Sequence, residues 1–358
     1  MLFLTNSKEE NMSKSSMIFG GIALFAASAL ADDSMLRKSV KEAGIMPFPK
    51  DAKALHALTE QSKDAKSNPS TKAKIELGKK LYFDPRLSRS NLISCNTCHN
   101  LALGGADAVP AAIGHKWTAN PSHLNSPTVY NSVFNSVQFW DGRSAHLADQ
   151  AQGPMQAAPE MASPKELIEQ RVNSIPAYVA EFKKTYGKDV KIDFKLVADT
   201  IAVFERTLVT PARFDDFLNG DNKALSKAEK EGLALFIDKG CASCHSGVNL
   251  GGTMQPFQVA AQYKFASLGG FKGDANGMVK TPTLRNITET APYFHNGAMW
   301  SLKDTIKEMG STQLGIEISD EEAKKIAVFF NSLEGRKPKI EYPILPALTD
   351  ETSKPTFD

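Results

Sequence analysis

Several patterns that would point to other classes of protein are missing or rare in this sequence of 358 residues. No block of Lys or Arg stands out, and 42 basic residues nearly balance 40 acidic ones, so a nucleic acid is not an expected partner. Strand patterns are scarce, which favours a mostly α-helical fold. The most apolar run, residues 17–30, is too short for a comfortable transmembrane helix, so stable membrane insertion is not expected.

The same apolar run has the layout of a secretory signal peptide. It follows Lys14 and ends in the small-residue sequence Ala29-Leu30-Ala31, which is typical of a cleavage site. We therefore predict a signal peptide over residues 1–31, with a membrane anchor as the alternative. Met12 is a candidate for the true start of translation, because the acidic residues before it are unusual in a signal peptide.

Cysteine occurs only four times, and all four copies lie in two C-x-x-C-H pentads, at residues 95–99 and 241–245. This pentad is the attachment sequence of a c-type haem, in which two thiols bind one porphyrin and the histidine binds its iron. Two pentads with no cysteine left over predict two covalently bound c-type haems. The predicted attachment and axial residues are Cys95, Cys98, His99, Cys241, Cys244 and His245.

Two other interpretations of the cysteines are less consistent with the pattern. A zinc site made of four thiolates would not need a histidine in the fifth position of both pentads. A pair of thioredoxin-type dithiols would sit in a βαβ pattern, which the sequence lacks. Because bacteria attach c-type haems outside the inner membrane, the haems and the signal peptide together predict a periplasmic location.

The segments around the two pentads resemble each other. An apolar-periodic helix precedes each pentad, and a P-T-x-x-N turn follows it, at residues 127–131 and 282–286. Gly142 and Gly297, each at the end of an F-x-[DN]-G turn, both stand 15 residues after the proline of the preceding turn. We therefore predict a mostly α fold with two cytochrome-c-like haem domains related by internal duplication.

The pattern also predicts how the chain is divided. A helix is expected over residues 71–83, and a capping box at residues 226–229 should begin a second helix that ends at residue 238. The predicted segments are the signal peptide (1–31), an N-terminal arm leading into the first domain (32–70), the first haem domain (71–213), the second haem domain (214–337) and a Pro-rich extended C-terminal strap (338–358).

The sixth ligand of each iron decides whether a haem carries electrons or reacts, because a haem with two strong axial ligands has no open position. In the second half, Met309 lies 12 residues beyond Gly297 on a predicted helix, and a methionine ligand raises the reduction potential. Met254, Met278 and Met299 are alternatives, since a methionine on a helix is more often part of the core.

The first haem has a histidine as its candidate sixth ligand. His115 lies in a loop rich in Gly, Ala and Pro, residues 103–117, that we expect to move, so the histidine could leave the iron and open it to a substrate. A surface histidine without a special role is the alternative. A methionine ligand is not expected here, because Gly153-Pro154 predicts a break in the helix that corresponds to the Met309 helix.

Polar and aromatic residues found only in the first half indicate chemistry at its haem. Gln150 and Glu160 flank the predicted break, and peroxide cleavage needs a base that takes a proton from one oxygen and returns it to the other. A carboxyl in a partly apolar pocket can have the raised pKa that this requires. Trp140 takes the place that His295 holds in the second half and could bridge electron transfer. A solvated glutamate and a core tryptophan are the alternatives.

Together these residues resemble the bacterial di-haem cytochrome c peroxidase family, over a region that runs from residue 75 to residue 346. The one departure from the family pattern is a slightly longer segment at residues 118–124, with an additional His123. The motifs that carry the resemblance are C-x-x-C-H-N-x-x-x-G-G at 95–105, I-G-H-x-W at 113–117, S-P-T-V-x-N at 126–131, Q-F-W-D-G-R at 138–143, G-P-M-Q at 153–156, E-M at 160–161, P-T-L-R-N at 282–286, P-Y-F-H-N-G at 292–297 and L-P-x-L at 345–348.

The resemblance implies a role for each candidate residue of the first half. The haem on His99 would be the low-potential site that reacts with peroxide, and His115 would be its removable sixth ligand. Glu160 and Gln150 would be the acid–base pair above that iron. Trp140 would lie between the two haems.

The resemblance also implies the ligands of the second haem and of one calcium ion. Met309 would bind the iron of a high-potential haem on His245. The calcium ion would lie between the domains, held by the side chain of Asn125 and the backbone carbonyls of Thr290 and Pro292. A hard oxygen site with several waters suits calcium.

The activity that the resemblance implies is reduction of hydrogen peroxide to two waters by a homodimer. The two electrons would come from a small periplasmic donor, either a cytochrome c or a cupredoxin. One alternative is the related di-haem enzyme that matures a tryptophan-derived quinone in a partner protein, but that enzyme has a tyrosine where this chain has Met309. The other is a non-catalytic di-haem electron carrier, which would have no open iron and no need for Glu160.

Overall fold

The computed structural model describes residues 32–358, so the predicted signal peptide and Met12 lie outside the described residues. The fold is mostly helical, as predicted, and none of the helices in the described part is long and apolar enough to cross a membrane. The elements are α1 (Asp33–Glu42), α2 (Ala52–Thr59), α3 (Lys72–Phe83), α4 (Cys95–Cys98), α5 (Leu147–Gln156), α6 (Lys165–Asn173), α7 (Pro176–Tyr186), α8 (Phe194–Glu205), α9 (Arg213–Leu218), α10 (Lys227–Asp238), α11 (Leu302–Met309) and α12 (Asp320–Phe330), with an antiparallel pair of strands, β1 (Met254–Pro256) and β2 (Met278–Lys280).

The first half is built on the contact between α3 and α8. α3 begins after Thr71, whose hydroxyl accepts a hydrogen bond from the backbone N–H of Lys74, and this confirms the helix predicted over residues 71–83. Gly78 allows the two helices to approach closely, because a Cβ atom there would lie 2.2 Å from the carbonyl oxygen of Thr200. Around this contact, α5, α6 and α7 complete a core of buried aliphatic and aromatic side chains.

The second half repeats this arrangement with α10 and α12. Ser226 and Glu229 form the predicted capping box at the start of α10, each side chain bonding the backbone N–H of the other residue. Gly232 of α10 again permits close helix packing, because a Cβ atom there would lie 2.1 Å from the carbonyl oxygen of Lys325. The sequence therefore predicted the first helix of each of these pairs, α3 and α10.

The two P-T-x-x-N turns also have matching geometry. Asn131 and Asn286 both have a left-handed backbone, with φ of 62° and 61°. Both donate a hydrogen bond from Nδ2 to the hydroxyl of Thr210, at 2.8 and 2.9 Å. Thr210 lies in the connection between the halves and joins the two turns at one point. The matched turns support the predicted repeat, while its origin by duplication stays a prediction.

The N-terminal arm contacts both halves, whereas the sequence suggested only that it leads into the first domain. Side chains of α1 and Ile45 belong to the core of the second half, and Ile45 pairs with Gly247, just after the second pentad. Leu55 and Leu58 of α2 then pack against the first half. The arm therefore runs across the junction of the two halves.

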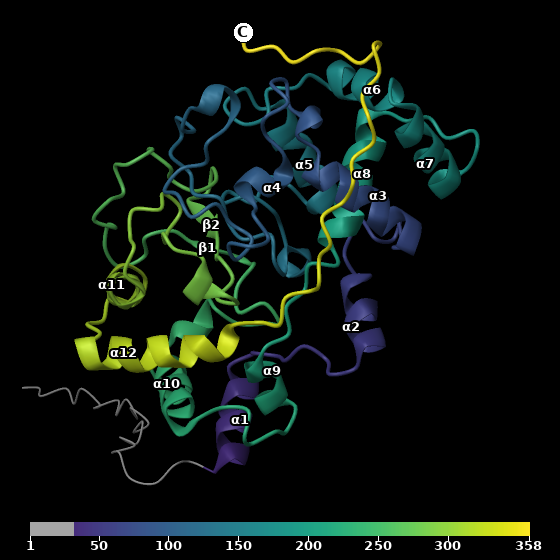
Figure 1. Ribbon diagram of the computed structural model, residues 1–358. Coiled ribbons are helices and arrows are strands. Elements are labelled where there is room, and N and C mark those ends of the chain that lie inside the picture. Colours follow the sequence, from purple (N-terminus) through teal and green to yellow (C-terminus); the bar gives the residue numbers. More distant parts are fainter. Residues whose placement is uncertain (1–31) are drawn as a thin grey trace, which may run out of the picture.

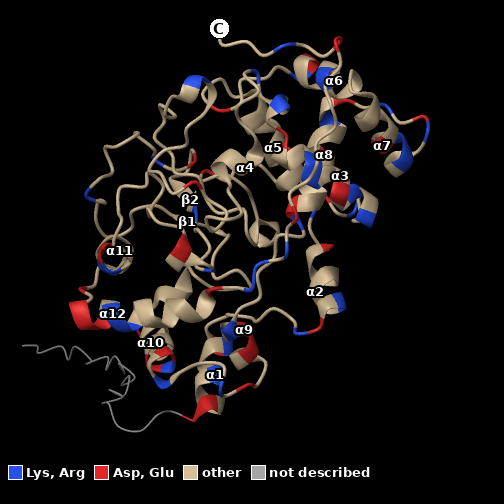
Figure 2. Ribbon diagram, in the orientation of Figure 1, with Lys and Arg blue, Asp and Glu red and all other residues tan. Residues whose placement is uncertain are grey.

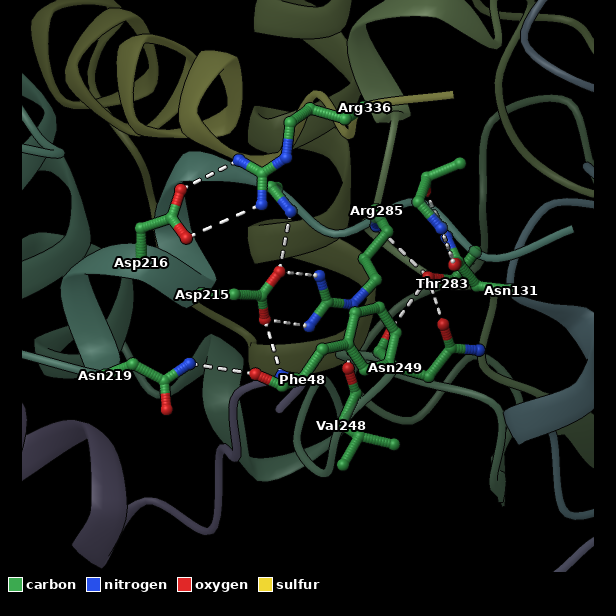
Figure 3. A network of polar contacts seen from close by, with 12 residues as sticks. Phe48, Asn131, Asp215, Asp216, Asn219, Val248, Asn249, Thr283, Arg285 and Arg336 are labelled. Atoms are coloured by element: carbon green, nitrogen blue, oxygen red, sulfur yellow. Dashed lines mark hydrogen bonds and ion pairs between the residues drawn. The ribbon is translucent and has the colours of Figure 1, made fainter. Parts of the chain in front are cut away.

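A buried ion pair fixes the arm beside the second pentad (Figure 3). Arg285 is fully buried and forms two hydrogen bonds with Asp215, at 2.8 and 2.9 Å. Its guanidinium group lies over the ring of Phe48, and its Nε donates to the carbonyl oxygen of Val248 at 2.7 Å. Because a buried charge without its partner is strongly destabilising, this network holds the arm and the loop after the pentad together.

The C-terminal tail is extended and runs from α12 across the first half to α6 (Figure 1). Arg86 donates to the carbonyl oxygen of Pro346 at 2.6 Å, and the buried side chain of Arg171 donates to the carbonyl oxygens of Ser353 and Lys354. These bonds support the predicted strap. Figure 2 shows Lys and Arg interspersed with Asp and Glu along the helices, as the balanced composition suggests.

Candidate functional site

The first pentad folds into the short helix α4, followed directly by His99. The Nδ1 atom of His99 lies 3.0 Å from the carbonyl oxygen of Pro127, and because a carbonyl only accepts, Nδ1 donates and Nε2 keeps its lone pair. Burial lowers the pKa of His99, which favours the neutral ring. A neutral imidazole oriented by a backbone carbonyl is the usual state of a metal-binding histidine, so this residue fits a haem iron.

The second pentad repeats these features at His245. Its Nδ1 atom lies 3.1 Å from the carbonyl oxygen of Leu250, and burial lowers its pKa to about 4. Cys241 and His245 line a mainly apolar cavity that is partly open to solvent. Cofactor pockets are usually lined by apolar and aromatic side chains with a few polar groups, so this lining is suited to a haem.

Met309, the last residue of α11, lines the same cavity as His245. Met299 instead packs in a separate cluster of buried aromatic side chains. Met254 and Met278 lie on the two strands and are not among the residues that line the cavity. Of the four candidate methionines, all within the described chain, only Met309 has the position that a ligand of this haem needs, and its coordination stays a prediction.

His115 is buried, with only 6% of its surface exposed, and neither ring nitrogen has a hydrogen-bond partner. The alternative of a surface histidine is therefore wrong. Nearly all buried polar groups in proteins find a partner, because leaving one without a hydrogen bond costs free energy. An iron atom would satisfy one of these nitrogens, so the side chain fits its predicted role.

The loop that carries His115 is held by the loop that carries Glu160. The backbone N–H of His115 donates to the carbonyl oxygen of Glu160 at 2.7 Å. Gly114 is needed for this contact, because a Cβ atom there would lie 2.0 Å from the carbonyl oxygen of Pro159. The next residue, Lys116, has a left-handed backbone with φ of 63°, which is uncommon for a residue with a side chain. The structure thus places the two candidate residues on adjoining segments.

Glu160 is half-buried near the first pentad. Burial raises the pKa of its carboxyl, while the nearby Arg143 opposes the shift. Its charge in turn contributes to the raised pKa of Cys98, after the larger effects of burial and of Asp107. A partly desolvated carboxyl beside the first haem attachment site has the protonation behaviour expected of an acid–base group.

Gln150 is half-buried on α5, and the break predicted after it is wrong. α5 continues to Gln156 with Pro154 inside it. Proline has no N–H to donate, so the carbonyl group of Gln150, four residues earlier, lacks its usual helical partner. The Gly-Pro pair therefore leaves the helix intact but removes one hydrogen bond at the residue that carries the candidate side chain.

Trp140 lies at the contact between the two halves. Its indole N–H donates to the carbonyl oxygen of Asn125 at 2.9 Å, and its ring centroid is 6.4 Å from that of His295. The backbone N–H of Lys280 donates to the carbonyl oxygen of Trp140, and that of Asn125 donates to the carbonyl oxygen of His295, at 2.8 and 2.7 Å. Asn125 and Lys280 are equivalent in the two repeats, as are Trp140 and His295, so each half binds the other in the same way.

The three residues expected to bind calcium all line the cavity that contains His245: Asn125, Thr290 and Pro292. The side-chain amide of Asn125 donates to the carbonyl oxygen of Val109 at 2.8 Å, which leaves its oxygen available. Residues 32–358 contain no cluster of three or more His, Cys, Asp or Glu side chains suited to a metal ion. A calcium ion here would therefore depend on neutral oxygen atoms and water, which the donor types allow.

Sequence reasoning missed one residue of this region, Lys280. It is buried, lines the cavity and belongs to the contact between the halves. The repeat could have identified it, because Lys280 and Asn125 each stand two residues before the proline of a P-T-x-x-N turn. His295 was noted only as the counterpart of Trp140, yet its Nε2 atom is buried without a partner.

Comparison with known proteins agrees with this description. A family model described as di-haem cytochrome c peroxidase matches residues 72–223, and a cytochrome c model matches residues 229–334. The cytochrome c551 peroxidase of Pseudomonas aeruginosa is 46% identical over 312 residues, which cover 83% of this chain and 89% of that protein. The corresponding enzyme of Nitrosomonas europaea is 41% identical over 320 residues, which cover 87% and 92%.

More distant relatives share the fold. The methylamine utilization protein MauG of Methylorubrum extorquens is 33% identical over 311 residues, covering 78% of this chain and 84% of that protein. A solved structure of a MauG-like protein associated with microbial copper homeostasis has a TM-score of 0.65 at 24% identity, covering 75% of this chain and 91% of that one. With two haem pentads and these relatives, the chain is an oxidoreductase with two c-type haems that belongs to the di-haem cytochrome c peroxidase family.

Proposed function

We propose that this enzyme reduces hydrogen peroxide at the haem on His99 and receives its electrons through the haem on His245. One peroxide, two electrons and two protons give two waters, with cleavage of the O–O bond. The observation that carries the assignment is the asymmetry of the two sites. Glu160, with its raised pKa, lies beside the first pentad, whereas the methionine Met309 lines the cavity of the second.

The haem on His99, once bound, supplies the iron and the electrons that break the O–O bond. Glu160 takes the proton from one peroxide oxygen and returns it to the other, which then leaves as water. Its raised pKa makes both transfers feasible near neutral pH. Gln150 has an amide that can hold the peroxide beside the carboxyl by a hydrogen bond.

Electrons enter at the second half, where Met309 would keep the potential of the haem on His245 high. Trp140 offers a path towards the first half, because it lines the cavity of His245 and its indole bonds to Asn125. Asn125 in turn lies two residues before Pro127, whose carbonyl oxygen orients His99. The path therefore runs from the cavity of His245 through the indole hydrogen bond to Asn125, along the backbone to Pro127, and through the hydrogen bond between Pro127 and His99.

His115 is the proposed gate of the first haem. In the oxidised protein it would occupy the sixth position and block peroxide. Reduction in the second half would act on the segment that contains Asn125 and weaken the hold on the loop of His115. The short bond from His115 to Glu160 means that movement of this loop also repositions the acid–base group.

A steady-state assay tests the proposal directly. We expect the purified protein to oxidise a reduced cytochrome c only when peroxide is added, and faster after the haem on His245 has been reduced. A plain electron carrier would exchange electrons with the cytochrome but show no dependence on peroxide. Absence of peroxide-dependent turnover in protein that carries both haems would contradict the proposal.

We further propose a calcium ion held by Asn125, Thr290 and Pro292. Asn125 belongs to the first repeat and the other two belong to the second, so the ion would tie the halves together at the cavity. Chelation should therefore lower peroxidase activity, and calcium should restore it. Full activity in protein shown by elemental analysis to be free of metal would exclude this site.

Replacing Met309 tests the assignment of the second haem. Met309→His exchanges a thioether for an imidazole and should lower the potential of the haem on His245 substantially. A redox titration should show the high-potential step shifted and the other step unchanged. The matched control is Met35→His, at an exposed methionine of α1, which should alter neither step. An unchanged high-potential step in Met309→His would mean that another residue is the ligand.

The cellular location, oligomeric state and electron donor of the enzyme are also part of this proposal. We propose a periplasmic location, because c-type haems are attached outside the inner membrane of bacteria, and a homodimeric state. The electron donor would be a cytochrome c or a cupredoxin, and comparing the rates with the two donors in the steady-state assay would show which of them the enzyme uses.

A second candidate function is maturation of a quinone in a protein partner, and it rests on the similarity to the MauG relatives. Oxidation of a protein-bound tryptophan in place of a reduced cytochrome would favour it.

A further inference from the structure

The helix that carries Gln150 begins with an unusual cap. His146 is the N-cap residue of α5, and its Nδ1 atom lies 3.2 Å from the backbone nitrogen of Asp149. Because a backbone N–H only donates, Nδ1 accepts this bond, so the ring is neutral and its proton is on Nε2. The usual N-cap residues are serine, threonine, asparagine and aspartate, whose side chains do not change charge near neutral pH.

His146 also fixes the backbone of Gln150. The carbonyl oxygen of His146 accepts a hydrogen bond from the backbone N–H of Gln150 at 3.0 Å. The carbonyl group of Gln150 lacks a helical partner of its own, because Pro154 has no N–H to donate. The position of Gln150 therefore depends on the first turn of α5 and on the residue that caps this turn.

The second half has a different residue at the equivalent position. Ser301 and His146 both stand directly before the leucine and three residues before the aspartate that the two repeats share. The hydroxyl of Ser301 accepts a hydrogen bond from the backbone N–H of Asp304 at 3.2 Å, which is the same bond that the ring of His146 makes. The half that contains Gln150 and Glu160 thus has a cap that can gain a proton, where the other half has one that cannot.

Protonation would oppose this cap in two ways. An imidazolium ring carries a proton on both nitrogens, so Nδ1 could no longer accept the bond from Asp149. Its charge would also lie at the N-terminus of a helix, which already carries a partial positive charge. Histidine is the side chain that changes charge between about pH 5 and pH 8. The carboxylate of Asp149 accepts a bond from the backbone N–H of Ala145 at 3.0 Å and would offset part of this charge.

Other ionisable groups lie on the elements that pack against this turn. Leu147 and Ala148 belong to one buried cluster with side chains of α2 and α8. The ionisable residues of these elements and of the preceding loop are Lys53, His56 and Glu60, Glu205 and Arg206, and the paired Asp141 and Arg143. Burial raises the pKa of Glu205 to about 8, and His56 is a second histidine, so a test must separate both from His146.

We propose that His146 is a positioning residue of the peroxide site. While its ring is neutral it caps α5 and holds Gln150 in place, and when it is protonated it releases the first turn. This role rests on the proposed function of Gln150, which is to hold the peroxide beside Glu160. Glu160 acts in the chemical step and determines the rate at saturating peroxide, whereas the cap acts on KM, which should rise as the pH falls.

Hydrogen exchange of the oxidised protein, on a peptide that covers residues 146–156, tests the cap without peroxide. Near pH 8, where a histidine is neutral, His146→Ala should lower the protection of the first turn about fivefold, the usual effect of losing an N-cap. His146→Ser should keep the wild-type protection. Near pH 5 the wild type should be less protected than His146→Ala, because it then has a positive charge at the helix start as well as no cap. His146→Ser should lose no protection over this range.

Steady-state kinetics test the positioning of Gln150. Near pH 8, His146→Ala should raise KM for peroxide by up to about fivefold, because a site binds in proportion to the fraction of molecules in which it is formed. The wild-type KM should rise as the pH falls, and His146→Ser should remove this rise. The dependence of kcat on pH should be the same in all three proteins. The matched control is His56→Ser, at an exposed histidine of α2, which should behave as the wild type in both experiments.

Each outcome decides the proposal. If the protection of the wild type follows pH as that of His146→Ser does, the switch is overturned, and any shared response belongs to His56 or Glu205. An unchanged KM in His146→Ala would overturn the positioning role. If His146→Ser does not load both haems, His146→Asn, a second cap without a titrating group, replaces it. If no variant turned over peroxide, the proposed function and the positioning role would both fail, whereas the exchange experiment would still show whether the cap responds to pH.

Discussion

Glu160→Gln should leave peroxide able to enter the first site but slow its reduction about 10²–10⁴-fold, the usual effect of losing an acid–base group. The amide has nearly the shape of the carboxyl, so binding should change little. It can neither take the proton from one oxygen nor return it to the other. Single-turnover kinetics of pre-reduced protein with peroxide would separate binding from this chemical step.

The role of Glu160 also predicts how the rate changes with pH. As a base, Glu160 must be ionised, so the wild-type rate should fall as the pH drops through its pKa, which burial raises above the ordinary value of 4.5. This acidic limb should disappear in Glu160→Gln. The control is Glu166→Gln, an exposed carboxyl at the start of α6, which should retain both the rate and the limb. A Glu160→Gln enzyme with the wild-type rate would assign the proton transfer to another group.

His115→Gly should remove the gate without removing the chemistry. Glycine cannot bind iron, so the first haem of the oxidised variant should have an open or water-bound sixth position. The variant should react with peroxide without prior reduction, whereas the wild type should be slow in that state. Electron paramagnetic resonance of the oxidised variant is the direct measurement, because loss of the imidazole should replace the low-spin signal of the first haem.

A second loop variant controls for changes in backbone freedom. His123→Gly lies in the segment that follows the gate loop, and the left-handed backbone there, with φ of 48°, suits glycine. It should keep the wild-type spectrum and the slow reaction of the oxidised state. If His115→Gly also kept the wild-type low-spin signal, His115 would not be the ligand and the gating mechanism would be wrong.

Much of the architecture was predictable because helices and pentads are local features. Residues 71–83 carry both an N-cap and an apolar period, and the structure has the corresponding helix. Comparing the two repeats also predicted which residues occupy equivalent positions, which no single motif could do. It related Trp140 to His295, and both residues lie at the same contact between the halves. Equivalent residues occupy equivalent places in the two halves because the P-T-x-x-N turns of both halves have the same backbone geometry.

The errors arose where packing overrides a local rule. Gly153-Pro154 predicted a broken helix, yet α5 continues, because proline removes only one hydrogen bond and surrounding packing compensates. The contact of the arm with the second half was not predicted: there the buried pair of Asp215 and Arg285 holds Phe48. Contacts between residues so distant in sequence leave no periodic trace. Lys280 was missed although its position in the repeat matches that of Asn125.

Rapid mixing of half-reduced wild-type protein with one equivalent of peroxide tests the central claim most directly. In that state the haem on His245 holds one electron, and the gate of His115 should be open. We expect fast, peroxide-dependent oxidation of the haem on His245, with spectral changes at the haem on His99. The fully oxidised protein should react far more slowly in the same experiment. Equal rates in the two states, or a half-reduced protein that does not react, would contradict this account.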